Sequence, residues 1–265
     1  MRSPGSTFDL RAALSEEVRG ALAEVENGGN GPEAVHACRV RLKRARSLAR
    51  VGHTFAPGLS AVFNDSARGI MRALAEARNF AALEKTSRSL AKRSKRRAAQ
   101  GLKAVSHALE AAREAAAPID LEAVNAGLRD LLALAQVWPE ASARQVKRGA
   151  RRIVRRARKA WRQAGEHGAP ADRRHAWRQR EKDRLYAASL LDEVWPTRRR
   201  CGANARLVSL LGREHDLALL GRELEASPAL ARNAAEAALK AVKAERKQLT
   251  KRARRVAERL HAGRA

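Results

Sequence analysis

The chain of 265 residues carries 55 Lys and Arg (43 of them Arg) against 28 Asp and Glu, a formal net charge of +27. Such a surplus costs stability through self-repulsion and therefore predicts a polyanionic partner; a GC-rich genome would explain arginine over lysine, but not the surplus. Aromatic residues make up only 3 %, which disfavours base stacking on single strands. The two cysteines, without a CxxC motif, suggest neither a disulfide framework nor a zinc knuckle.

The first fourteen residues lack the apolar core of a signal peptide, and apolar runs such as residues 131–135 are far too short to span a bilayer. We therefore expect a cytoplasmic protein without a membrane anchor.

Proline and glycine divide the chain into segments rich in the strong helix formers Ala, Leu, Arg and Glu. The breaks lie at 27–32, 53–58, 117–118, 138–139, 165–170, 195–196 and 227–228. Helices are predicted near residues 9–26, 33–52, 60–80, 82–116, 120–136, 140–164, 171–194, 202–223 and 229–262. The chain has only three Ile and five Thr, so strands are poorly supplied, and the fold class is predicted to be all-α and built from helical bundles.

Two blocks of sequence recur in the same order. The pattern His36-x-x-Arg39-x-x-x-Lys43 returns as His175-x-x-Arg178-x-x-x-Lys182, and residues 74–83 (LAEARNFAAL) align with 211–220 (LGREHDLALL). Two copies at nearly the same offset indicate a duplication rather than a solenoid. We predict one domain over residues 1–265 with related halves at about 8–138 and 139–262, joined near Pro139 and packed with a pseudo-twofold.

The helix predicted at 33–52 carries one basic stripe. At about 100° per residue, five side chains share an arc of about 80°: His36, Arg39, Lys43, Arg46 and Arg50. No Asp or Glu occurs between Val35 and Val51, so these like charges repel unless an anion binds. Valine, leucine and alanine flank the stripe, which favours a helix packed on both sides with its charges turned into a groove. The alternative is a solvated face with long side chains lying along the surface.

Other predicted helices add basic stripes. The helix at 140–164 presents a row that includes Arg148, Arg152 and Arg155, and the last helix presents Lys243 and Lys247 within another. The second repeat copy is thinner, because Leu185, Tyr186 and Ser189 follow its first three basic positions. These stripes either line a shared cavity or point outward in different directions.

The pattern resembles the CHAD family, α-helical domains named for a characteristic histidine. The resemblance covers about residues 8–262 and rests on the basic stripe at 36–50, on Arg78 in the first 74–83 block, on His175, Arg178, Lys182 and Tyr186, and on Asp216 in the second block. Asn79 and Ala81 depart from the family's usual aspartates, and Leu185 replaces an expected basic residue.

The resemblance implies two four-helix bundles with pseudo-twofold symmetry around a basic cavity that binds inorganic polyphosphate, in some members at polyphosphate granules. This chain looks like a stand-alone form, without the triphosphate-tunnel domain often fused to the family. On this interpretation no catalytic residue, metal or cofactor is expected, and sulfate or phosphate is expected to occupy the site in crystals. The predicted polyphosphate ligands are the basic side chains of the stripes and of the repeat: His36, Arg39, Lys43, Arg46, Arg50, Arg78, Arg148, Arg152, Arg155, His175, Arg178, Lys182, Lys243 and Lys247.

Three alternatives remain open at this point. Net charge alone would favour a general nucleic-acid-binding protein, although no helix-turn-helix or other docking motif is evident. A polyphosphate-processing enzyme would need carboxylates that hold a metal ion beside the phosphates, and acids are sparse in the stripes. The basic amphipathic helix at 144–162 also permits membrane-surface binding, but its apolar face is small.

Overall fold

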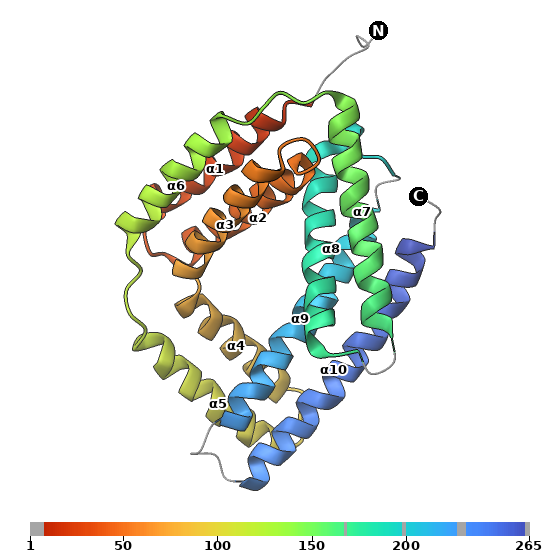
Figure 1. The fold of residues 1–265 in the computed structure, drawn as a ribbon. Helices are drawn as coiled ribbons and strands as arrows, with labels where there is room; N and C mark the ends of the chain where they lie inside the picture. Colours follow the sequence, from red (N-terminus) through yellow and green to blue (C-terminus); the bar gives the residue numbers. More distant parts are fainter. Residues whose placement is uncertain (1–7, 167–168, 198–199, 227–231, 263–265) are drawn as a thin grey trace. The chain divides into compact units, whose positions relative to one another are not determined.

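The structure is a computed structural model that describes residues 8–166, 169–197, 200–226 and 232–262; the side chains of residues 76–78 and 171 also lie outside the described part. Within these residues the chain is all-α, as predicted, and contains no strand (Figure 1). None of the described helices is long and apolar enough to cross a membrane.

The chain forms two compact units. Unit 1 comprises residues 8–74 and 119–204, and its helices are α1 (Leu10–Gly28), α2 (Pro32–Gly52), α3 (Pro57–Ala73), α6 (Leu121–Gln136), α7 (Ala143–Gly165) and α8 (Ala171–Leu191), followed by a short 3₁₀ turn, η1 (Asp192–Val194). Unit 2 comprises residues 75–118 and 205–262, and its helices are α4 (Glu76–Ala91), α5 (Arg96–Glu114), most of α9 (Cys201–Ala226) and α10 (Arg232–His261).

Helix starts follow the local chemistry of the sequence. Asp9 and Asp120 accept hydrogen bonds from the backbone N–H groups of Ala12 and Ala123, each at 2.9 Å, and so cap α1 and α6. Ser142 begins α7 with a reciprocal capping box. α2 and α3 begin with a proline in the first turn. Proline has no backbone N–H, and N–H groups in the first turn have no acceptor within the helix, so no helical hydrogen bond is lost there. The predicted breaks up to 195–196 are confirmed, and the break at 227–228 lies outside the described residues.

The prediction of two helices at 60–80 and 82–116 is wrong, because three helices, α3, α4 and α5, occupy this stretch. No proline or glycine marks either break, and the first is set by a tertiary contact: Arg39 of α2 donates hydrogen bonds to the last carbonyl groups of α3. At the second break the chain turns tightly, with the Ser94 hydroxyl donating to the Leu90 carbonyl at 2.9 Å. Helix propensity alone did not predict these ends, because tertiary contacts override it.

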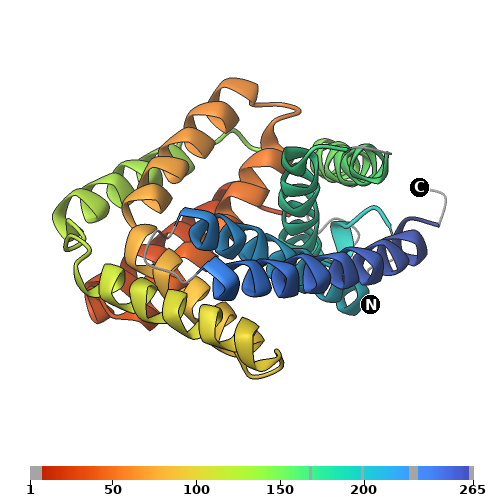
Figure 2. The ribbon, with the colours of Figure 1, turned by 90° about the horizontal axis from the view of Figure 1, so that it is seen from below.

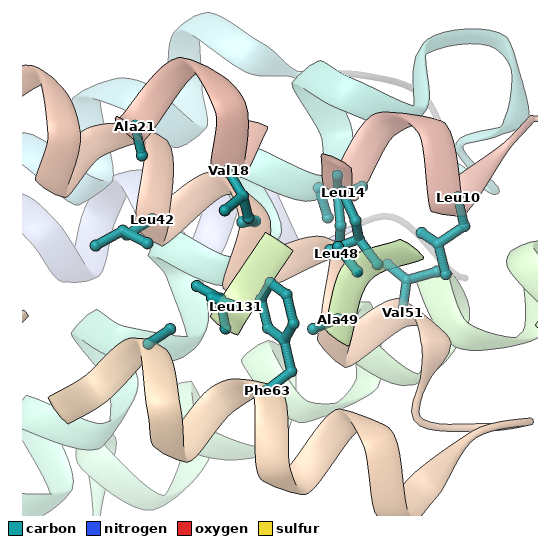
Figure 3. Close-up of a cluster of buried hydrophobic side chains, with 14 of the residues drawn as sticks. Leu10, Leu14, Val18, Ala21, Leu42, Leu48, Ala49, Val51, Phe63 and Leu131 are labelled. Carbon is teal, nitrogen blue, oxygen red and sulfur yellow. The ribbon is translucent and has the colours of Figure 1, made fainter. Parts of the chain in front are cut away.

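The core of unit 1 lies where α1, α2, α3 and α6 meet (Figure 3). Leu14 and Val18 of α1, Leu48 of α2, Phe63 of α3 and Leu131 of α6 are fully buried there. Phe63 also meets the ring of Trp138 edge to face, with centroids 5.8 Å apart. This apolar packing covers one side of α2. α7 and α8 also pack against α2.

Unit 2 is held by packing and by a few polar links. α5 packs against both α4 and α10 (Figures 1 and 2). Gly101 permits the close approach of α5 to α10, since a Cβ there would stand 2.5 Å from the carbonyl oxygen of Ala234. Arg246 of α10 donates to Glu214 of α9 at 2.9 and 3.1 Å.

Corresponding parts of the predicted repeat lie in the same unit. The two His-containing patterns lie on α2 and α8, which contact each other in unit 1. The two blocks around 74–83 and 211–220 lie mostly on α4 and α9 in unit 2. Each compact unit therefore draws helices from both predicted halves of the chain. The single domain, its halves at 8–138 and 139–262, and the pseudo-twofold around a basic cavity stay predictions.

Candidate anion-binding site

The cations of α2 separate into a group paired with α1 and a group that is not. Arg44 donates to the buried carboxylate of Glu17 at 2.7 and 2.8 Å, and Arg41 lies 3.8 Å from both Glu17 and Glu24. Arg41 and Arg44 are the two cations that depart from the predicted stripe. The carboxylates of α1 thus neutralise the side of α2 away from the stripe.

The N-terminal part of the stripe has mixed surroundings. His36 is exposed in the first turns of α2, and Lys43 is half-buried. Arg39 is buried, and its guanidinium donates to the carbonyl oxygens of Met71 and, at 2.9 Å, Leu74. These bonds satisfy carbonyl groups at the C-terminus of α3 that have no helical partner. Arg39 therefore has a structural role in the described fold, and its predicted role as a phosphate ligand stays a prediction.

The C-terminal part of the stripe, Arg46 and Arg50, meets α3 and α8. Arg50 Nη1 lies 2.6 Å from Asp183 Oδ1 of α8, and Arg180 Nη1 lies 3.2 Å from the other oxygen of the same carboxylate. Arg46 Nε lies 3.4 Å from Asn64 Oδ1 of α3. Asp183 is thus a buried carboxylate shared by arginines from two helices.

α7 brings two further arginines, Arg152 and Arg156, to this place. It crosses α2 at Gly149, where a Cβ would stand 2.0 Å from the carbonyl oxygen of Val51, so only glycine permits the approach. Both side chains are half-buried. The close crossing holds the basic side of α7 beside the C-terminal end of α2.

Six arginines from four helices are close enough to influence one another's charge, and we call them the arginine cluster: Arg46, Arg50, Arg68, Arg152, Arg156 and Arg180. Burial, and then the charge of Arg50, lowers the pKa of Arg46 to about 10. Burial, and then the charge of Arg180, also lowers the pKa of Arg152 and Arg156. Six arginines lie beside two carboxylates, Asp183 and Asp65, so the cluster holds a net positive charge.

The carboxylates beside the cluster are few. Asp183 accepts from Arg50 and Arg180, and Asp65 pairs with Arg68 at 3.2 Å on α3. His53, at the C-terminal end of α2, is half-buried close by. Its pKa is lowered by burial and then by the charges of Arg152 and Arg156. Within the described residues, no group of three His, Cys, Asp or Glu side chains is arranged to hold a metal ion.

The predicted residues of the second repeat copy lie on a different side of α8. His175, Arg178 and Lys182 are half-buried, and at about 100° per residue they lie roughly opposite Arg180. The pKa of His175 is lowered by burial and then by the charges of Arg178 and Lys182, so these three groups lie near one another. α8 therefore presents one basic side to the arginine cluster and a second basic side that the repeat pattern had marked.

The remaining predicted ligands are not part of the cluster. Arg148 and Arg155 are exposed on α7. Arg155 is nevertheless close enough to Arg152 for its charge to lower the pKa of Arg152. Lys243 and Lys247 are exposed on α10 in unit 2. Arg78 lies in α4, but its side chain is outside the described residues.

The described residues of unit 2 line pockets of about 280 and 630 Å³ that share Arg93 and Glu245 in their walls. Lys243 and Lys247 line neither of them.

Sequence reasoning found Arg46, Arg50 and Arg152 but missed Arg68, Arg156 and Arg180. Arg156 was available to it, because it follows Arg152 by four residues and therefore lies on the same side of α7. Arg180 was overlooked because it faces away from the repeated His-Arg-Lys pattern. Arg68 stands beside Asp65 in a helix with little other charge, and no sequence signal marked it.

Comparisons with known proteins agree with the fold. The solved structures that resemble this one include the crystal structure of the CHAD domain from the plant Ricinus communis, with a TM-score of 0.70 and 20% identity over 100% of this chain and 96% of that chain. PptA from Streptomyces chartreusis matches with a TM-score of 0.67 and 18% identity over 93% of this chain and 95% of that chain. The comparison with curated proteins gave no match. A model of the CHAD domain family matches residues 12–225, and the chain therefore belongs to the CHAD domain family.

Proposed function

We propose that this protein binds inorganic polyphosphate, with the arginine cluster of unit 1 as a principal part of the site. The observation that carries the proposal is that six arginines from α2, α3, α7 and α8 lie near one another beside two carboxylates, Asp183 and Asp65. The lowered pKa values of Arg46, Arg152 and Arg156 reflect burial together with mutual repulsion. A bound anion would relieve this repulsion.

The chemistry of the cluster suits a chain of phosphates. A guanidinium is a planar fork that binds phosphate oxygens through two parallel, charge-assisted hydrogen bonds. Guanidinium groups on four helices supply several such forks, which suits a polymer with a charge on each repeating unit better than a single small anion. A flexible single chain is also thin enough to reach half-buried groups between helices.

We further propose that the protein binds polyphosphate without cleaving it. Phosphoryl transfer normally uses carboxylates to hold metal ions beside the phosphates. The two carboxylates next to the cluster, Asp183 and Asp65, are both held by arginines. Release of phosphate from polyphosphate in the presence of Mg²⁺ or Mn²⁺, lost in a cluster variant, would contradict this part of the proposal.

The decisive experiment is a calorimetric titration of long-chain polyphosphate into the wild type and the double variant Arg46→Gln/Arg156→Gln. Glutamine keeps a polar group that can still donate hydrogen bonds, but it is shorter than arginine and carries no charge. Two charge-assisted hydrogen-bonding groups are worth about 3 kcal/mol or more together, so the affinity should fall about 100-fold.

The matched control is Arg11→Gln/Arg129→Gln, which removes the same charge from unit 1. Arg11 and Arg129 each pair with a single glutamate at 3.3 and 3.2 Å on the surface, where ion pairs contribute little. Its affinity should stay within about twofold of the wild type. An equal loss in both variants would mean that diffuse net charge, and not the cluster, attracts the polymer.

Association with polyphosphate granules is the finer part of this proposal, and it rests on the resemblance to the family. A fluorescent fusion of the wild type should collect at granules, and the Arg46→Gln/Arg156→Gln fusion should not. A granule signal that persists in the variant would separate granule association from the cluster.

A further inference from the structure

α7 carries a second basic surface that points away from the arginine cluster. The helix has ten Lys and Arg and no Asp or Glu over its whole length. Arg152 and Arg156 lie on its half-buried side, whereas seven other cations are exposed. We call these seven the outer face of α7: Arg144, Lys147, Arg148, Arg151, Arg155, Lys159 and Arg162.

The outer face differs from the other basic helix surfaces of the described chain. On α2 and α10, cations pair with carboxylates of a neighbouring helix, as in Arg44 with Glu17 and Arg246 with Glu214. The ion pairs in the described part of unit 1 join residues of α1, α2, α3, α6 and α8, together with Glu140 before α7 and Glu166 at its end, and none of these pairs contains a cation of the outer face. Like charges three and four residues apart repel, so the surface is unfavourable until an anion covers it.

The shape of the outer face indicates an extended, rigid polyanion. At about 100° per residue, Arg144, Arg151 and Arg162 lie within about 20° of one line along the helix. They span 18 residues, or about 27 Å, which is the length of about eight base pairs. The seven side chains are exposed, so they can lie against a duplex that is too wide to enter a space between packed helices.

An anionic membrane is the weaker fit. The apolar residues of α7, which include Val146, Ile153 and Ala157, are buried in the protein. Because the helix has no free apolar side to insert between lipids, a membrane could be held only by charge. Arginine predominates on the outer face, and its fork suits phosphodiester oxygens.

We propose that the outer face of α7 binds the phosphodiester backbone of a nucleic-acid duplex. Binding there is independent of base sequence, since phosphate contacts carry no sequence information. It is also separate from the arginine cluster, so one variant can lose duplex binding while polyphosphate binding remains.

The test measures the binding of a fluorescent 24-base-pair DNA duplex by anisotropy at several salt concentrations. The variant Arg144→Ala/Arg151→Ala/Arg162→Ala removes three phosphate contacts outside the cluster. Its plot of log affinity against log salt should be shallower by about 2 to 3, and its affinity should fall about 100-fold at 0.1 M salt. Its affinity for polyphosphate should stay within about threefold of the wild type, because all six cluster arginines remain.

Two controls make the result specific. Lys240→Ala/Lys251→Ala/Arg254→Ala removes the same charge from exposed positions of α10 and should leave duplex binding nearly unchanged. The cluster variant Arg46→Gln/Arg156→Gln should lose polyphosphate but keep the duplex. Loss of duplex RNA binding in the same α7 variant would also support the proposal.

Three results would overturn the proposal: no duplex binding by the wild type, an equal loss in the α10 control, or vesicles of anionic lipid that compete as well as duplex per phosphate. Failure of the wild type to bind polyphosphate would remove the proposed function and leave this inference standing, because the two ligands are titrated separately.

Discussion

Arg50 Nη1 of α2 lies 2.6 Å from Asp183 Oδ1 of α8, and this pair joins two helices across 133 residues of sequence. Asp183 also accepts from Arg180 at 3.2 Å, so one carboxylate is the internal counter-ion of two guanidinium groups. A phosphate that enters the cluster would meet the same two arginines. Asp183 is therefore expected to compete with the ligand while it stabilises the empty protein.

Replacement of Asp183 by asparagine should separate these two effects. Without the carboxylate the repulsion within the cluster rises, and stability without ligand should fall by about 2 to 3 kcal/mol, since a partly buried ion pair loses one partner. The affinity for polyphosphate should rise about tenfold. Melting temperatures with and without sulfate report the stability, and sulfate should stabilise the variant more than the wild type. Calorimetric titration with polyphosphate reports the change in affinity.

Asp130→Asn is the control for this prediction, because Asp130 is exposed on α6 and its loss changes the net charge equally. A variant Asp183→Asn that binds polyphosphate more weakly than the wild type would contradict the idea of competition.

Replacement of Gly149 by alanine should disturb the cluster from a distance. The added Cβ would stand 2.0 Å from the carbonyl oxygen of Val51, so α7 must move away from α2. We expect a loss of about 2 kcal/mol or more of stability and weaker polyphosphate binding, because Arg152 and Arg156 move with the helix. Chemical denaturation and calorimetry measure the two effects.

Gly69→Ala provides the contrast within unit 1, because a Cβ at Gly69 in α3 meets nothing within 4 Å. This change should stabilise the protein by about 0.5 to 1 kcal/mol through lower backbone entropy in the unfolded chain. Equal stability of the two glycine variants would show that the close crossing at Gly149 does not constrain α7.

Replacing Arg39 and replacing Arg46 should affect the stability of the ligand-free protein differently, although both residues lie on the same stripe. Arg39→Ala leaves the carbonyl groups of Met71 and Leu74 without their donor and should cost about 2 to 3 kcal/mol of stability. Arg46→Gln relieves repulsion within the cluster and should be neutral or slightly stabilising. Urea denaturation of the two variants checks this, and a larger loss for Arg46→Gln than for Arg39→Ala would reverse the assignment of roles.

Polyphosphate affinity should rise as the pH falls below neutral. Burial, and then neighbouring cations, holds the pKa of His53 and His175 below the ordinary 6.5. A bound polyanion would raise both pKa values, so each histidine takes up a proton on binding at a pH between its free and bound values. The gain in affinity begins near the bound-state pKa and is complete below the free-state pKa.

Calorimetry in two buffers of different ionisation enthalpy counts the protons taken up at pH 6. The uptake should fall in His53→Asn and in His175→Asn but not in His107→Asn, which alters an exposed histidine of unit 2. Affinity that stays constant from pH 7.5 to 5.5 would argue against protonation of either site.

The two cysteines should differ sharply in reactivity. Burial raises the pKa of the Cys38 thiol to about 12, so it is neither ionised nor accessible at neutral pH, whereas Cys201 is exposed. A maleimide should label one thiol in the native protein, and none in the variant Cys201→Ser until denaturant is added. Rapid labelling of Cys201→Ser without denaturant would show that the core of unit 1 opens readily.

The sequence was most informative where local chemistry decides the structure. Prolines and glycines set most helix ends, and the 3.6-residue period placed Arg46 and Arg50 on one side of α2. Prediction from the sequence failed where a contact between residues distant in sequence determines the structure. The end of α3 is an example, because it depends on Arg39. The same limit hid Arg180: only the packing of α8 against α2 and α7 shows that this arginine, on the side of α8 without the repeat pattern, joins the cluster.

The interleaving of the two predicted halves within each unit has a consequence for synthesis on the ribosome. α2 cannot gain its contacts with α8 until residues 171–191 have been made, and α5 cannot pack on α10 until the last helix emerges. Contacts between such distant segments slow folding, because long loops must close before the contacts form. The nascent chain should therefore present α2 with one side uncovered for much of translation, which is a target for chaperones. A fragment cut near residue 138 is accordingly expected to lack a complete unit on either side of the cut.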